Sequence, residues 1–293
     1  MHVGRKIPIS IERYLMDGAI VALLLLLYAP LIIHWYDGWL NKSISLEHEY
    51  FSHGIIGFPF AAYICWLNRD RWQALPQRSS PIGLGLMALG AVFYLSSLSN
   101  LVNLSLPIVL AGLCLWLKGL SGLKLQAFSL LLVFLATPTS MPYLIEPYTF
   151  PLQRFIAGMA GFILHQLRLD VTVRDIALYV GDRIVEVAPH CAGLKMLFTS
   201  LYVGLMLLFW REDLHSRARV TLFLVSTALM SVLANIIRNT LLTFMHGTGR
   251  DSLFAWFHDS WGGDLYSACM LLLLIPILIG IERLFPDPVP DQS

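Results

Sequence analysis

Long apolar runs constrain this chain more than any other feature of its sequence. Only 13% of its residues are charged, about half the share in soluble domains, so we expect a multi-pass membrane protein. The predicted fold class is all-α, with about eight transmembrane helices in a single domain over residues 1–293 and short cytoplasmic tails at 1–17 and 284–293. The predicted spans lie near residues 18–35, 53–67, 82–99, 103–119, 124–141, 193–210, 220–244 and 262–283.

The first apolar run follows a basic N-terminus, as the core of a signal peptide would. It ends in bulky residues (AIVALLLLLYAPLIIHW) rather than in a small-residue cleavage site, so we expect it to be retained as the first span. The net charge is +1, and no basic patch indicates a nucleic-acid partner.

The positions of Lys and Arg predict which loops face the cytoplasm. Basic residues precede the first span, follow the second and fourth spans, and lie at 210–219 between two later spans. Both termini are then cytoplasmic, and the loops 36–52, 142–192 and 245–261 lie outside. If residues 150–169 crossed the membrane fully, the basic loop at 210–219 would lie outside. We therefore predict an interfacial or re-entrant helix at 150–169. Residues 170–188 alternate polar and apolar side chains around Gly181-Asp182, which predicts an extracytoplasmic β-hairpin.

Cys191 lies where this hairpin gives way to the next helix. Pro189 ends the strand, and the helical run begins at about Ala192 or Gly193. The thiol is then at a helix N-terminus, where unpaired N–H groups and Lys195, one turn further on, favour a thiolate. A packed structural cysteine explains the position equally well. The chain has no CxxC pair, so neither a zinc site nor a disulfide framework is predicted.

Two further residues point to function at the same membrane face. Arg238 lies inside a span on one face with Asn235 and Asn239, and a charge there costs at least about 2.5 kcal/mol. Snorkelling to the interface explains the arginine but not the asparagines, which we expect to orient it. His258 starts the last span from the outside, where it is either an interfacial residue among tryptophans or a proton-transfer group oriented by Asp259.

These groups together fit a cysteine hydrolase or transferase. Cys191 would attack a carbonyl, His258 would transfer a proton to the leaving amine, and Arg238 would stabilise the oxyanion or fix the substrate. His190 is a competing base, although a residue adjacent to the nucleophile often points its side chain away.

At these residues the chain resembles the exosortase/archaeosortase family of polytopic membrane transpeptidases. The family's cysteine, its N-x-x-R helix and its downstream histidine correspond here to PHCAGLK, NIIRN and FHDSWGG, and its SHG to Ser52-His53-Gly54. The hairpin before the cysteine matches as well, and the resemblance covers most of the chain. His190 and Ala192 depart from the residues that the family commonly has beside its cysteine.

The resemblance implies that Cys191, Arg238 and His258 form the catalytic triad of a cysteine peptidase or transpeptidase, with His53 among the supporting residues. It implies exported substrates with a tripartite C-terminal sorting signal of the PEP-CTERM kind: a short motif, a transmembrane helix and a basic cluster. Cleavage would form a thioester on Cys191 and pass the new C-terminus to an unknown acceptor such as a polysaccharide or lipid. The implied location is a prokaryotic inner membrane, with the site at the extracytoplasmic face and no cofactor.

Other functions stay open from the sequence alone. An intramembrane protease or acyltransferase could use the same Cys–His pair with water or lipid as acceptor. A transporter could bind an anionic substrate at Arg238, although no convincing internal repeat is visible. A non-catalytic component of an export or polysaccharide system would tolerate loss of all three groups. Glu47, His48, Glu49 and His53 match no metal motif, so no metal site is predicted.

Overall fold

Helices make up most of the described part of this chain, which also contains one small sheet. The computed structural model describes residues 11–40, 50–187 and 193–286. The helices of the first half are α1 (Ile11–Leu40), α3 (Gly54–Leu67), α4 (Arg69–Ala74), α5 (Pro81–Tyr94) and α6 (Ser99–Leu135). Those of the second half are α7 (Met141–Ile145), the 3-10 helix η1 (Glu146–Thr149), α8 (Phe150–Gln166), α9 (Leu194–Trp210), the 3-10 helix η3 (Asp213–His215), α10 (Arg217–Gly247), α11 (Asp251–Asp259), α12 (Trp261–Leu272) and α13 (Leu274–Leu284).

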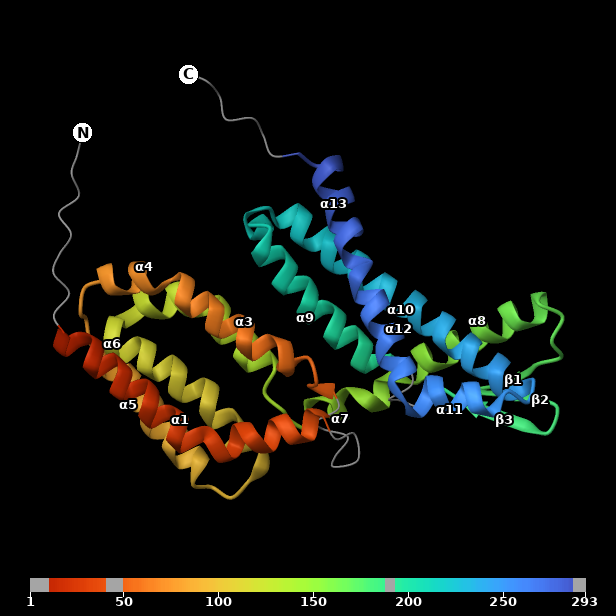
Figure 1. The fold of residues 1–293 in the computed structure, drawn as a ribbon, viewed down its shortest axis with the longest axis horizontal. Helices are drawn as coiled ribbons and strands as arrows, with labels where there is room; N and C mark the ends of the chain where they lie inside the picture. Colours follow the sequence, from red (N-terminus) through yellow and green to blue (C-terminus); the bar gives the residue numbers. More distant parts are fainter. Residues whose placement is uncertain (1–10, 41–49, 188–192, 287–293) are drawn as a thin grey trace.

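The helices form two groups. Figure 1 shows α1 and α3 to α6 together on the red-to-yellow side, and α8 to α13 with the sheet on the green-to-blue side, with α7 between them. In the first group α5 and α3 pack on α6, and in the second α8, α9 and α13 pack on α10. Helix α10 is therefore the central element of the second group.

Four helical segments among the described residues are long and apolar enough to cross a membrane. They are Gly18–Leu40, Ser99–Leu135, Arg217–Gly247 and Trp261–Leu284, and three shorter apolar helices are Gly54–Leu67, Pro81–Tyr94 and Leu194–Trp210. Many of their outward side chains are large and apolar, such as Leu26, which is 76% exposed, as expected where lipid replaces water. These helices confirm a multi-pass membrane protein, whereas the count of eight spans and the side assigned to each loop stay predictions.

The break expected between the predicted spans 103–119 and 124–141 is present, as a sharp kink rather than a longer loop within α6. The two helical segments meet at a kink at Gly119, whose φ of +62° and ψ of −157° are non-helical. A Cβ at this position would lie 2.9 Å from the carbonyl oxygen of Arg78, so the close approach and the positive φ both require glycine. Beside the kink, the ammonium of Lys118 donates to the carbonyl of Leu75 at 2.7 Å. These two contacts hold the kink against the segment that precedes α5.

The predicted hairpin is confirmed and has one strand more than expected. Strands β1 (Thr172–Arg174), β2 (Ala177–Val180) and β3 (Arg183–Glu186) form an antiparallel sheet in the order β1-β2-β3. Leu178 pairs with Val173 on one side and with Val185 on the other. The β2–β3 turn contains Gly181, whose φ is +59°, as the alternation around Gly181-Asp182 indicated.

The sheet lies against α8 and the end of α10. A Cβ at Gly161 of α8 would lie 2.2 Å from Val173, and one at Gly247 of α10 would lie 2.6 Å from Val180. Both strands therefore lie directly on helix backbone. Leu178 is fully buried in a cluster with residues of α8 and with Ile236 of α10. This packing fixes the sheet and α8 to the end of α10.

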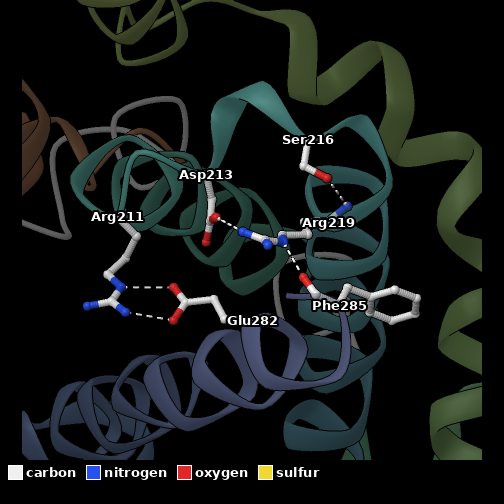
Figure 2. Close-up of polar contacts among 6 residues, drawn as sticks. All are labelled: Arg211, Asp213, Ser216, Arg219, Glu282 and Phe285. Carbon is white, nitrogen blue, oxygen red and sulfur yellow. Dashed lines mark hydrogen bonds and ion pairs between the residues drawn. The ribbon is translucent and has the colours of Figure 1, made fainter. Parts of the chain in front are cut away.

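A cluster of charged and polar groups closes the other end of α10. The guanidinium of Arg219 donates to the Asp213 carboxylate at 2.6 Å and to the carbonyl of Phe285 at 2.7 Å. Arg211 of the α9–α10 connection makes a two-point ion pair with Glu282 of α13, and Ser216 accepts from the backbone N–H of Arg219 as the N-cap of α10. Figure 2 shows these six residues, which we call the Arg219 cluster. They join α9, α10 and the end of α13.

Candidate functional site

A cavity of about 590 Å³ lies between the two groups of helices. The first group contributes the end of α1, Tyr50 and the start of α3, and the second contributes the start of α9, one face of α10, His258 and the first turns of α12. A cavity of this volume accommodates a small molecule or a short peptide segment. It is the place where helices far apart in the sequence meet.

Gly193 holds the start of α9 against α10 at the cavity wall. It is the N-cap of α9, with φ of +82° in the left-handed region. A Cβ there would lie 2.8 Å from the amide group of Asn235, which is itself buried. Glycine is required both for the backbone conformation and for this contact. The start of α9 thereby meets α10 at Asn235, one helical turn from Arg238.

Arg238 contributes a guanidinium to the cavity from α10. Its Nε is shielded from solvent and has no hydrogen-bond partner within the described residues. One of its terminal nitrogens lies 3.8 Å from where a Cβ on Gly263 would stand, so the two residues are neighbours at the cavity wall. A buried donor without a partner costs about 1–3 kcal/mol, which a ligand could offset by supplying the acceptor.

His258 lines the cavity from α11. Its Nδ1 lies 2.6 Å from the carboxylate of Asp259, and its ring stacks on Phe254 with 5.2 Å between centroids. When Nδ1 carries the proton shared with Asp259, the lone pair of the neutral ring is on Nε2. These contacts fix both the ring and its tautomer.

The glycine pair after His258 sets how α11 meets α12. A Cβ on Gly262 would lie 2.8 Å from the ring and carbonyl of Trp256, and one on Gly263 would lie 2.8 Å from the carbonyl of Phe257. Side chains at either position would therefore push α11 away from α12. The sequence FHDSWGG thus positions His258 through close backbone packing.

The sheet contacts the end of α10 and the start of α11. Arg183 of β3 donates to the carbonyl of His246 at the end of α10, at 2.9 Å, and forms an ion pair with Asp251 at the start of α11. This guanidinium holds the pKa of the Asp251 carboxyl below its usual value. The ring of Phe254 lies between those of His246 and His258, at 4.9 Å and 5.2 Å. The three-stranded sheet therefore contributes to the placement of His258.

His53 reaches the same cavity from the first group of helices. It precedes α3, is only 5% exposed, and its Nε2 lies 3.2 Å from the carbonyl of Leu135. Its ring packs against Tyr202 at 4.4 Å. Gly54, the next residue, lies under the indole of Trp39, where a Cβ would be 2.4 Å from the ring. The SHG motif therefore brings a histidine and a tryptophan together at the wall.

The structure brings most of the residues predicted from the sequence to this cavity. His53, Lys195, Asn235, Arg238 and His258 all line it. Cys191 and His190 lie outside the described residues. One expectation is corrected: His258 does not start the last span but lies on the separate short helix α11, because Ser260, in an extended conformation, separates α11 from α12.

Two supporting residues contact the cavity residues from behind. Asn239 is buried and donates its amide to the carbonyl of Asn235 at 2.9 Å, and Asp259 binds His258 as described. Asn239 thus contacts the helix backbone beside Arg238. Its expected role in orienting the guanidinium stays a prediction.

Some cavity residues were not predicted from the sequence. Trp39, Tyr50, Asp264 and Ser267 line the cavity but belong to no motif. Asp264 could have been found as an ionisable residue next to an apolar run. Trp39 could not, because only the packing of α1 on α3 brings it to the site. Within the described ranges there is no group of three or more His, Cys, Asp or Glu side chains suited to a metal ion.

Comparison with known families identifies the class of protein that this fold and cavity belong to. Residues 35–275 match the family described as transmembrane exosortase, and this range covers most of the chain and all the residues that line the cavity. The chain belongs to the exosortase family. This family consists generally of membrane cysteine transpeptidases that act on exported proteins with C-terminal sorting signals. No curated protein and no solved structure matches the chain.

Proposed function

We propose that this protein is a membrane cysteine transpeptidase that cleaves the C-terminal sorting signals of exported proteins. The observation that carries the proposal is the convergence of Gly193, Arg238 and His258, from three separate elements, on one cavity. Cys191 precedes Gly193 by two residues, and two residues of any chain span at most about 7 Å. We propose that this cysteine acts as the nucleophile at the cavity.

The proposed reaction begins with addition of the Cys191 thiolate to the scissile carbonyl. The guanidinium of Arg238, which has a shielded donor without a partner in the described part of the chain, stabilises the oxyanion that forms. The imidazolium of His258 then gives its proton to the leaving amine as the C–N bond breaks, which leaves a thioester on Cys191.

The second half of the reaction reverses these roles. The nucleophile of the acceptor adds to the thioester carbonyl while His258 Nε2 takes its proton. The C–S bond then breaks and the Cys191 thiolate is released. Asp259, bound to Nδ1, stabilises the imidazolium in both halves.

The proposed substrates carry a tripartite tail of the PEP-CTERM kind. The cavity lies between two groups of apolar helices, so a substrate whose tail is a transmembrane helix can present the peptide before that helix to the cavity. We propose that the protein resides in a prokaryotic inner membrane, with both termini in the cytoplasm and the cavity at the extracytoplasmic face. The acceptor is a lipid or a cell-surface polysaccharide.

The test is mass spectrometry of an exported tripartite-tail protein from the same genome, co-expressed with the wild type or with Cys191→Ala. We expect the wild type alone to remove the tail and leave an adduct on the new C-terminus. A free carboxylate there would indicate a protease instead. Full processing by Cys191→Ala would contradict the proposal and favour the transport or scaffold functions.

A further inference from the structure

Two shielded nitrogens at the cavity wall lack hydrogen-bond partners within the described residues: Nε1 of Trp39 and Nδ1 of His53. Trp39 is 7% exposed and His53 is 5% exposed, and both residues line the cavity. Buried polar groups are almost always hydrogen-bonded, so two such atoms at one cavity need a physical explanation. They belong to the opposite helix group from Arg238.

The two nitrogens have complementary chemistry. The indole Nε1–H of Trp39 can only donate. Nε2 of His53 lies 3.2 Å from the carbonyl of Leu135, and a carbonyl can only accept, so the ring proton is on Nε2. Burial favours the neutral ring, which leaves Nδ1 as an acceptor. The wall therefore offers one donor and one acceptor.

The two side chains are held rigidly. The Trp39 indole lies on Gly54, the residue after His53, and packs against Phe58 at 5.7 Å. The His53 ring packs on Tyr202, whose hydroxyl donates to the carbonyl of Leu132 at 3.0 Å. Packing on Gly54, Phe58 and Tyr202 thus holds the two side chains in place beside each other at the cavity wall.

We infer that Trp39 and His53 bind the main chain of an extended peptide segment of the substrate. One residue of an extended strand presents its C=O and its N–H on the same side. The carbonyl would accept from Trp39 Nε1, and the N–H would donate to His53 Nδ1. This subsite rests on the proposed function and adds how the substrate is held: by main-chain contacts that tolerate different side chains at that position. Because both nitrogens are covered, docking displaces a neighbouring side chain.

Matched substitutions at His53 separate its two nitrogens. In His53→Gln the side-chain amide takes the place of Nε2 and keeps the bond to Leu135, but the Nδ1 acceptor is lost. In His53→Asn the amide oxygen takes the place of Nδ1 and the bond to Leu135 is lost. We expect about 10-fold slower processing for His53→Gln and for Trp39→Phe, in line with one hydrogen bond, and faster processing for His53→Asn than for His53→Gln. Trp35→Phe and Tyr202→Phe are the controls, because their polar atoms bind within the protein.

A chemical replacement identifies the contacted group in the substrate. After the cleavage site has been mapped, synthetic peptides across it are prepared with single amide N–H groups replaced by ester oxygens. We expect one ester to slow cleavage by the purified wild type about 10-fold and to have no further effect on His53→Gln. If no ester position shows this loss, or if His53→Gln and Trp39→Phe process at the wild-type rate, the subsite is wrong. If processing does not depend on Cys191, the proposed function itself fails.

Discussion

Helix α10 carries two arginines, Arg219 buried and Arg238 half-buried, whose surroundings differ completely. Arg219 and Arg238 lie 19 residues apart, about 28 Å along an α-helix. Arg219 is fully engaged by Asp213 and the carbonyl of Phe285 (Figure 2). Arg238 lines a cavity, and its Nε has no partner in the described ranges. The first arginine joins α10 to the α9–α10 connection and to the end of α13, whereas we propose that the second donates to an acceptor on the substrate.

This difference separates stability from activity along one helix. A buried charge with its partner in place is compensated in the folded state, and removal of one member leaves the other without compensation. A buried donor held without a partner is unfavourable for folding and is retained where it serves binding or catalysis. Substitutions at the two ends of α10 should therefore have opposite effects on stability and processing.

The largest expected effect is that of Arg219→Met on stability. Asp213 is as buried as Arg219, with side-chain exposures of 7% and 6%, so its carboxylate would remain without the guanidinium. Loss of one member of such a pair costs about 3–5 kcal/mol, measured as a lower unfolding temperature in detergent. The double variant Arg219→Met with Asp213→Leu should recover much of that loss. Each folded molecule should still process substrate at the wild-type rate, and a single variant as stable as the wild type would contradict the ion pair's role.

Next in size is the effect of Arg238→Lys on processing. A lysine keeps the charge but loses the planar guanidinium and its Nε donor. Loss of one donor to an oxyanion lowers the rate by about 10²–10³-fold, so we expect that reduction in processing per folded molecule. The unfolding temperature should stay at or above the wild-type value. A variant that is destabilised but processes normally would make Arg238 a second structural arginine.

The effect of Asp259→Asn should be smaller than that of either arginine. Asp259 binds Nδ1 of His258, and its side chain is 67% exposed, so solvent weakens the ion pair. We expect processing to fall on the order of 10-fold, below the roughly 10²–10⁴-fold that acid–base catalysis contributes. Asp264→Asn, at the same cavity, is the matched control. Equal losses for both variants would mean that the general charge of the cavity matters, rather than the orientation of His258.

Much of this arrangement could be predicted from the sequence, because lipid imposes simple rules. The last apolar run, predicted at 262–283, is helical over Trp261–Leu284, and the strand alternation around Gly181 predicts the sheet correctly. Arg238 was predicted as a site residue because a charge inside an apolar run is costly in lipid, and it lines the cavity. These features depend on local patterns of polarity, which the sequence displays directly.

The features that could not be predicted depend on contacts between distant segments. The kink at Gly119 follows from its approach to Arg78, and the place of Trp39 follows from its packing on Gly54. A glycine in an apolar run is compatible with many neighbours, so its sequence position does not reveal which one it contacts. The short helix α11 was also missed, since its residues fall within 245–261, which the positions of the basic residues predicted as an external loop.

The smallest expected effect concerns two tryptophans four residues apart on α1. Trp35 is fully buried and its Nε1 donates to the side chain of Asn103 at 2.9 Å. Trp39 Nε1 has no such partner within the residues described. Substitution by phenylalanine removes the N–H and keeps an aromatic ring. We therefore expect Trp35→Phe to cost about 1–2 kcal/mol, because Asn103 loses a buried bond, and Trp39→Phe to cost less or to stabilise the protein.

Unfolding temperatures of the two variants in the same detergent test this difference. Both lose similar ring volume, so the contribution of packing is matched and the difference reports the hydrogen bond. If Trp39→Phe is the less stable variant, the N–H of Trp39 is hydrogen-bonded within the folded protein. The contrast between Arg219 and Arg238 then has no counterpart on α1. The other outcome is that Trp35→Phe is less stable while only Trp39→Phe processes substrate slowly. In that case a polar group with a partner inside the protein supports stability and one without such a partner supports processing, on α1 as on α10.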